Sequence, residues 1–133
     1  MAEYCHSPSW KHIVWKWLFT DSNGNIYKNT WVAAYNPYAN TALGQNNFDW
    51  FYFDANGYMA TGWLEDDERK YYLNPISDGT KGRMITGWQL IDGKWYYFNE
   101  ISDGTKGALM TDTWIGEYYV NQDGIWKEDK KLQ

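Results

Sequence analysis

One seven-residue segment, Ile-Ser-Asp-Gly-Thr-Lys-Gly, occurs identically at residues 76–82 and 101–107, a shift of 25 residues. The segment Thr-Gly-Trp at 61–63 returns at 86–88 with the same shift. Repetition at a fixed period is the signature of a repeat architecture, in which each unit buries its apolar face only by stacking on its neighbours. The chain is therefore expected to be an array of similar units.

Each repeat predicts a β-hairpin, and residues 86–99 show it most clearly. The dipeptide Asp92-Gly93 separates two apolar runs there, and it favours a two-residue turn because both residues readily adopt positive φ. Closing that turn pairs Trp88 with Tyr97, and the alternation of side chains along a strand places both rings on one face. An isolated two-stranded hairpin is marginal in water, and both faces of this one are aromatic, so neighbouring copies must cover it.

Five such units can be traced from the tryptophans and the aromatic runs. First strands carry one tryptophan each, at Trp10, Trp31, Trp63, Trp88 and Trp114. Second strands open an aromatic run that precedes a glycine turn, and they start at Trp17, Trp50, Lys70, Trp95 and Glu117. These two positions are seven residues apart in the first, third and fourth units. The second unit holds a long insertion between them and the fifth is shortened, so the array is irregular at two places.

We predict an all-β fold in which stacked β-hairpin repeats form a solenoid, because no apolar period of 3.6 residues is sustained and Gly, Asn and Asp recur. One repeat domain is expected to span residues 1–133. Its irregular part is 1–48, with an insertion at 32–49, while 50–126 holds the regular repeats and 127–133 a tail. The insertion is longer than typical hairpin loops, which leaves it as either a functional or a mobile loop.

The stacked faces are expected to be lined by apolar residues of the second strands. This inward set, assigned to the core, is Phe51, Phe53, Tyr71, Leu73, Tyr96, Phe98, Tyr118 and Val120. After the glycine turns come Met59, Met84 and either Leu109 or Met110, which are expected to fill gaps between hairpins. The opposite face of each hairpin, carrying residues such as Trp88 and Trp95, is expected to line the seams between successive hairpins. A binding function would be located in these seams.

Composition argues against several classes of function. Aromatic residues make up 20% of the chain, which has ten Trp, yet the mean hydropathy is −0.73, so some rings are expected at the surface. No run of 18 apolar residues exists, so no membrane insertion is expected. The net charge is −5 and no basic cluster exceeds the Lys127–Lys131 tail, which argues against a nucleic-acid partner.

Residues for catalysis or metal binding are sparse. Cys5, His6 and His12 are too few and too irregularly spaced for a zinc site. The acidic run 65–68 falls in a predicted turn, where it is expected to be solvated rather than to supply the two carboxylates of a glycosidase. We therefore expect no enzyme activity, no metal and no cofactor, although a catalytic domain could exist elsewhere in a longer parent protein. The first residues lack the regions of a signal peptide, which leaves a cytosolic protein or a piece of a longer secreted one.

The pattern of Gly-Trp, six residues, Trp-Tyr-Tyr-Phe-Asn and a glycine turn resembles the choline-binding, or cell-wall-binding, repeats of Gram-positive surface proteins and phage lysins. The similarity is close over residues 60–126 and looser over 10–59. Similar repeats occur in the glucan-binding regions of streptococcal glucosyltransferases and the receptor-binding ends of clostridial toxins. The resemblance implies hairpins stacked in a left-handed solenoid, with a ligand caged by two aromatic residues of one hairpin and one of the next.

Carried onto this chain, the resemblance implies three aromatic cages. They are Trp88 and Trp95 closed by Tyr119, Trp31 and Trp50 closed by Tyr72, and Trp10 and Trp17 closed by Tyr52. In the unit of Trp63, Lys70 stands where a second ring is expected, and its charge would repel a quaternary ammonium. This seam is therefore expected to be empty of choline. The two tryptophans of the last unit, Trp114 and Trp126, are expected only to cap the array.

Such cages suit choline because electron-rich ring faces attract a quaternary ammonium, at about 0.5–2 kcal/mol per ring. The resemblance implies a non-catalytic module at the bacterial cell surface that binds choline, as phosphocholine of teichoic acids, through several weak sites acting by avidity. A glucan-binding or other carbohydrate-binding module and a toxin-type receptor-binding module are alternatives, since flat rings also stack on sugars. For each cage, tryptophans that only pack the repeat are the competing interpretation. A homodimer is a further expectation.

Overall fold

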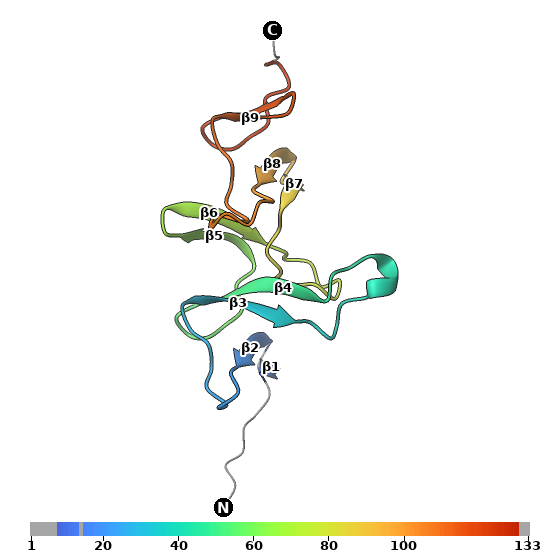
Figure 1. Ribbon diagram of the computed structural model, residues 1–133, viewed down its shortest axis with the longest axis vertical. Helices are drawn as coiled ribbons and strands as arrows, with labels where there is room; N and C mark the ends of the chain where they lie inside the picture. Colours follow the sequence, from blue (N-terminus) through green and yellow to red (C-terminus); the bar gives the residue numbers. More distant parts are fainter. Residues whose placement is uncertain (1–7, 14, 131–133) are drawn as a thin grey trace, which may run out of the picture. The chain divides into compact units, whose positions relative to one another are not determined.

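In residues 8–13 and 15–130, which the computed structural model describes, ten β-strands form five antiparallel hairpins (Figure 1). Hairpins 1 to 3 are β1 (Ser9–Ile13) with β2 (Lys16–Thr20), β3 (Thr30–Tyr35) with β4 (Phe48–Phe53), and β5 (Gly62–Asp66) with β6 (Arg69–Leu73). Hairpins 4 and 5 are β7 (Gly87–Ile91) with β8 (Lys94–Phe98), and β9 (Thr113–Ile115) with β10 (Tyr118–Val120). Cys5 and His6, considered above for metal binding, lie outside the described residues.

The predicted fold class, an all-β array of stacked hairpins, is confirmed. The helical content of the described residues is one short 3-10 turn, η1 (Thr41–Leu43). Hairpin 4 has the predicted register, with Trp88 opposite Tyr97 and Ile91 opposite Lys94. Its turn residues Asp92 and Gly93 have φ of 50° and 78°, the left-handed values that a two-residue turn of this kind requires. The Asp-Gly dipeptide thus sets the register from local sequence alone.

The chain divides into two compact units. Unit 1 comprises residues 1–62 and 73–84, and unit 2 comprises residues 63–72 and 85–133. Hairpins 1 and 2 belong to unit 1, and hairpins 4 and 5 with most of hairpin 3 belong to unit 2. The expectation of one domain over the whole chain stays a prediction.

Successive hairpins are joined by the segment that follows each glycine turn. In unit 1 the N–H of Met59 donates to the carbonyl of Trp17 at 2.8 Å. In unit 2 the equivalent bonds run from Leu109 to the carbonyl of Lys70 at 2.7 Å and from Trp126 to the carbonyl of Trp95 at 2.9 Å. In hairpins 1, 3 and 4, the second strand therefore accepts a hydrogen bond from the residue that follows the glycine turn of the next hairpin, as expected for stacked repeats.

Each unit has its own hydrophobic core, to which the second strands of its hairpins contribute. In unit 1 it gathers Phe19, Ala34, Phe51 and Phe53, and in unit 2 Ile85, Ile91 and Phe98. Six of the predicted inward residues are buried: Phe51, Phe53, Tyr71, Leu73, Phe98 and Val120. Tyr96 is half-buried, and Tyr118 is 50% exposed, so its assignment to the core is wrong.

The loop between β3 and β4 is shorter than the insertion predicted at 32–49. Strand β3 extends to Tyr35 and β4 begins at Phe48, because Ala34 packs into the core of unit 1. The remaining loop, residues 36–47, docks on the turn that follows β6. The side-chain amide of Asn36 donates to the carbonyl of Gly79 at 2.7 Å, and that of Gln45 to the carbonyl of Asp78 at 2.9 Å.

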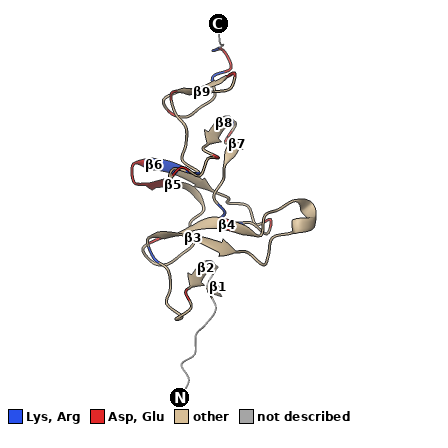
Figure 2. Cartoon of the chain, viewed as in Figure 1, with Lys and Arg blue, Asp and Glu red and all other residues tan. Residues whose placement is uncertain are grey.

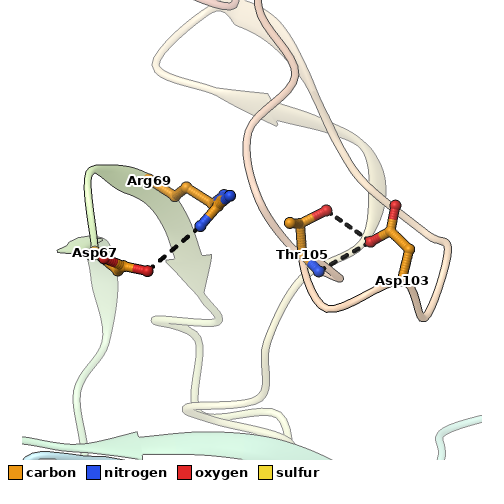
Figure 3. A network of polar contacts seen from close by, with 4 residues as sticks. All are labelled: Asp67, Arg69, Asp103 and Thr105. Atoms are coloured by element: carbon orange, nitrogen blue, oxygen red, sulfur yellow. Dashed lines mark hydrogen bonds and ion pairs between the residues drawn. The ribbon is translucent and has the colours of Figure 1, made fainter.

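The two copies of the repeated heptapeptide form identical turns held by an Asn, an Asp and a Thr. In the first, the Thr80 hydroxyl and N–H donate to one carboxylate oxygen of Asp78 at 2.6 and 2.9 Å, and the Asn74 amide adds a bond at 3.1 Å. Figure 3 shows the equivalent pair of bonds from Thr105 to Asp103, at 2.7 and 2.9 Å. These donors stabilise the ionised carboxylates and lower the pKa of Asp78 and of Asp103 below the ordinary value.

Because the pKa of Asp78 is lower in the folded state, unit 1 is expected to lose stability as the pH falls into the acidic range. The Thr80 hydroxyl, followed by the Thr80 N–H and Asn74, holds the pKa of Asp78 below its value of about 3.9 in an unfolded chain. Ionised Asp78 therefore adds stability above about pH 4, and this contribution is lost as pH falls through the folded pKa. We expect Asp78→Asn to flatten the decline of the melting temperature between about pH 5 and pH 2. Identical acid dependence in variant and wild type would contradict this.

Candidate ligand-binding pockets

Four aromatic side chains of unit 2 line an open pocket of about 350 Å³, here called the C-terminal pocket: Trp88, Trp95, Tyr118 and Trp126. Hairpin 4 supplies Trp88 from β7 and Trp95 from β8, hairpin 5 supplies Tyr118, and Trp126 follows the last glycine turn. The rings of Trp88 and Tyr118 lie 5.8 Å apart at 85°, and those of Tyr118 and Trp126 lie 6.1 Å apart at 80°. Adjacent walls therefore stand nearly at right angles around an apolar space.

The pocket is open to a ligand from solvent. Trp95 is 40% exposed and Tyr118 is 50% exposed, while Trp88 and Trp126 are half-buried. Aromatic surface that neighbouring side chains leave exposed to this extent is typical of a binding site. Trp126, expected only to cap the array, forms a wall of the pocket instead.

Tyr119, predicted to close this cage, lies elsewhere. It pairs directly with Trp114 of its own hairpin, the two rings being 5.3 Å apart. Its hydroxyl donates to the carboxylate of Asp112, an interaction that raises the pKa of Tyr119. The ammonium of Lys130 stands 4.3 Å from the centre of its ring. Tyr119 thus already has partners, and the neighbouring Tyr118 takes the place in the pocket.

Unit 1 contains a second aromatic pocket of about 250 Å³, here called the N-terminal pocket. Its lining residues are Trp10, Trp17, Asn36, Tyr38, Phe51, Met59, Ser77, Gly79 and Lys81. The ring of Trp10 lies 6.1 Å from that of Trp17 at 86° and 4.8 Å from that of Phe51 at 79°. Tyr38, which comes from the insertion loop, lies 5.3 Å from Trp17. The loop is therefore part of the pocket.

Tyr52, predicted for this site, does not line the pocket. Like Tyr119, it packs on the tryptophan opposite it in its own hairpin, Trp31, at 5.2 Å. In both pockets the third ring comes from one position earlier in the second strand, Phe51 or Tyr118. The same relation recurs in unit 2, where Tyr96 lies 5.0 Å from Trp63. Hairpins 2, 4 and 5 thus each present the side of the second strand that carries Phe51, Tyr96 or Tyr118 to the tryptophan of the preceding hairpin.

Comparisons with known proteins decide the family. The family model of the choline-binding repeat matches residues 44–80 and 79–114. The chain belongs to the choline-binding repeat family. A comparison with curated proteins gives no match.

Solved structures of the family share the fold. Choline-binding protein F from Streptococcus pneumoniae, crystallised with a peptidoglycan analogue, is 33% identical over 92% of this chain, with a TM-score of 0.66. The choline-binding domain of Spr1274 from Streptococcus pneumoniae is 39% identical over 63% of this chain and 90% of its own length, with a TM-score of 0.50. The Cpl-1 endolysin is 25% identical over 98% of this chain, with a TM-score of 0.56. The chain spans 34% of choline-binding protein F and 40% of the endolysin.

The remaining predicted cage of this choline-binding repeat protein stays a prediction. Trp31 and Trp50 lie on β3 and β4 of unit 1, and Trp50 is 42% exposed. Tyr72 belongs to unit 2, where its ring lies 5.2 Å from that of Trp63. Like Tyr52, Tyr72 therefore packs on the tryptophan of its own hairpin.

Lys70 occupies the position that the repeat gives to Trp17 and Trp95. All three residues accept, through their carbonyls, the N–H of the residue that returns from the next glycine turn, which for Lys70 is Leu109. On the first strand of the same hairpin, the ring of Trp63 lies 5.0 Å from that of Tyr96 and 5.8 Å from that of Phe98. Hairpin 3 thus supplies one tryptophan and a cation, whereas hairpins 1 and 4 each supply two tryptophans to their pockets.

Charged residues fall mainly at turns and hairpin ends (Figure 2). The acidic turn of hairpin 3 is exposed, and Asp67 forms an ion pair with Arg69 at 3.5 Å (Figure 3). Within residues 8–13 and 15–130, no group of three metal-ligating side chains is found. Over the same range, no helix is long and apolar enough to cross a membrane.

Proposed function

We propose that this chain is a non-catalytic cell-wall-binding module that holds choline, as the phosphocholine of teichoic acids, in aromatic cages between hairpins. Choline-binding repeats are binding modules, and the C-terminal pocket is the single observation that carries the proposal for this chain. Four rings surround a space that contains no charged side chain among its lining residues. A trimethylammonium group is a cation with weak hydration, and ring faces attract it by about 0.5–2 kcal/mol each.

Weak individual sites fit this role. Three or four such contacts give an affinity in the millimolar to high-micromolar range, with each factor of ten corresponding to about 1.4 kcal/mol. A polymer carrying many choline groups would be retained by avidity when two pockets engage it together. The N-terminal pocket supplies a second site in the same chain. Location at a bacterial cell surface follows from this proposal, and the homodimer stays a prediction.

Titration with choline tests the proposal against its alternatives. We expect choline to quench tryptophan fluorescence and to raise the melting temperature, since a ligand that bridges two hairpins stabilises only the folded state. The neutral isostere 3,3-dimethylbutanol should bind much more weakly, because it has the same shape without the charge. Equal binding of the isostere would contradict a cation cage. Saturation by dextran or maltose, with none by choline, would establish a carbohydrate-binding module instead.

Replacing Lys70 with tryptophan is expected to add one choline site. The wild-type seam lacks one ring, worth about 0.5–2 kcal/mol, and places a like charge near the ligand, at a cost of about 1–4 kcal/mol. Trp63 and Tyr96 already stand at the positions of Trp88 and Tyr118 in the C-terminal pocket. Calorimetry of Lys70→Trp should therefore show one more choline per chain than wild type. Unchanged stoichiometry, or choline already bound against Trp63 in the wild type, would reject the interpretation.

A further inference from the structure

The two copies of the repeated heptapeptide have different surroundings. The copy at residues 76–82 contributes Ser77, Gly79 and Lys81 to the lining of the N-terminal pocket. In the C-terminal pocket the lining consists of four aromatic rings. One pocket therefore combines aromatic walls with a cation and a hydroxyl, and the other is wholly aromatic.

The turn that carries Lys81 is fixed in place on both sides. Within the turn, Thr80 is 1% exposed and is bonded to Asp78 and Asn74. From outside, the insertion loop holds Gly79 and Asp78 through the amides of Asn36 and Gln45. The approach is close, since a Cβ on Gly79 would fall 2.6 Å from the carbonyl oxygen of Tyr38. The backbone at Lys81 is thus held at the edge of the pocket.

A lysine in such a place acts in opposite directions on two kinds of ligand. Its ammonium repels the trimethylammonium of free choline, which the rings of Trp10, Trp17 and Tyr38 attract. The same ammonium attracts a phosphate, and the Ser77 hydroxyl can donate a hydrogen bond to it. Phosphocholine carries both groups a few bonds apart. Its two charges match the two kinds of lining residue, the aromatic rings for the cation and Lys81 with Ser77 for the anion.

We propose that the N-terminal pocket recognises a choline phosphate ester as a zwitterion, with the trimethylammonium between the rings and the phosphate at Lys81 and Ser77. The C-terminal pocket, by contrast, binds the trimethylammonium group whether or not a phosphate is attached. This inference rests on the proposed function, because it presupposes that the rings hold choline. It makes Lys81 a specificity-determining residue and gives the insertion loop a role in positioning it.

The second heptapeptide supplies a matched control. Lys106 has the same sequence neighbours as Lys81 and is also exposed. It is absent from the lining residues of both aromatic pockets. The variants Lys81→Met and Lys106→Met therefore remove the same charge from the same kind of turn, and only Lys81 lines one of the two aromatic pockets.

Each pocket can be observed separately in the full chain labelled with 5-fluorotryptophan. The ¹⁹F resonance of Trp17 reports on the N-terminal pocket and that of Trp95 on the C-terminal pocket, each assigned with a Trp→Phe variant. Choline, phosphocholine and glycerophosphocholine are titrated into wild type, Lys81→Met and Lys106→Met. The third ligand distinguishes a phosphodiester, as in a polymer or lipid, from a free phosphate monoester.

At Trp17 we expect wild type to prefer phosphocholine over choline by about fivefold, the size of an exposed charge pair together with relief of repulsion. Raising the salt from about 0.1 M to 1 M should reduce this preference, because the Debye length falls from about 10 Å to 3 Å. Lys81→Met should abolish it, and Lys106→Met should leave it intact. At Trp95 no preference is expected in any of the three proteins.

The outcomes separate this inference from the proposed function. If the Trp17 resonance reports equal affinities for choline and phosphocholine, and Lys81→Met does not change them, the proposed zwitterion recognition is wrong while choline binding stands. An equal loss of preference in Lys81→Met and Lys106→Met would also overturn it, as an effect of net charge alone. No response of either resonance to any of the three ligands would overturn the proposed function itself.

Discussion

Replacing Trp95 with alanine is expected to weaken choline binding at the C-terminal pocket by about twofold to thirtyfold, which corresponds to one cation–π contact of about 0.5–2 kcal/mol. Trp95 is the ring that β8 contributes to this pocket, and it is 40% exposed. Its removal therefore deletes a wall of the site without opening a cavity in the core. Calorimetric titration with choline measures the loss, and the melting temperature without ligand shows whether the fold is unchanged.

Two controls make this result specific to the pocket. Trp114→Ala removes a ring that packs on Tyr119 and does not line the pocket, so its effect on choline affinity should be smaller than that of Trp95→Ala. Tyr118→Leu and Tyr119→Leu change neighbouring tyrosines to the same apolar residue, and only the first should weaken binding. Equal losses of choline affinity in Trp95→Ala and Trp114→Ala, or a larger loss in Tyr119→Leu than in Tyr118→Leu, would show that choline does not bind in the C-terminal pocket.

Replacing Phe98 with alanine is expected to lower the free energy of unfolding of unit 2 by about 3–5 kcal/mol. Phe98 is 0% exposed and forms the core of this unit with Ile85 and Ile91. Its strand position also pairs with Leu109, which returns from the following turn. The substitution therefore leaves a cavity where hairpin 4 joins the following segment. Since domains of this size are stable by only about 5–15 kcal/mol, unit 2 should be largely destabilised.

Phe48→Ala is the matched control for Phe98→Ala. Phe48 begins β4, is 56% exposed and should cost less than about 0.5 kcal/mol when truncated. Urea denaturation followed by circular dichroism compares the two variants with wild type. A loss below about 1 kcal/mol for Phe98→Ala, or equal losses for the two variants, would contradict the core described here.

The hairpins and their registers were predictable because their determinants are local. Asp92-Gly93 fixes the turn of hairpin 4, and the spacing of seven residues identifies Trp17, Lys70 and Trp95 as equivalent, which the hydrogen bonds of their carbonyls confirm. Burial of Phe98 follows from the alternation of side chains on the same strand.

The third wall of each pocket could not be predicted in the same way. Tyr118 and Tyr119 are the same residue at adjacent positions, and the choice between them depends on how one hairpin rotates onto the next. That rotation is a tertiary property without a local sequence signal. The position of Trp126, directly after the last glycine turn where Met59 stands in unit 1, was a usable signal. Tyr38 reaches the N-terminal pocket from a loop with no counterpart in the other repeats, so the repeat pattern contains no information about it.

A crystal of the chain soaked in choline would show directly whether the C-terminal pocket binds choline. We expect a choline molecule in the C-terminal pocket, with its trimethylammonium group between the faces of Trp88, Trp95, Tyr118 and Trp126. Choline seated against Tyr119 with this pocket empty, or no choline at the aromatic seams at saturating concentration, would contradict it.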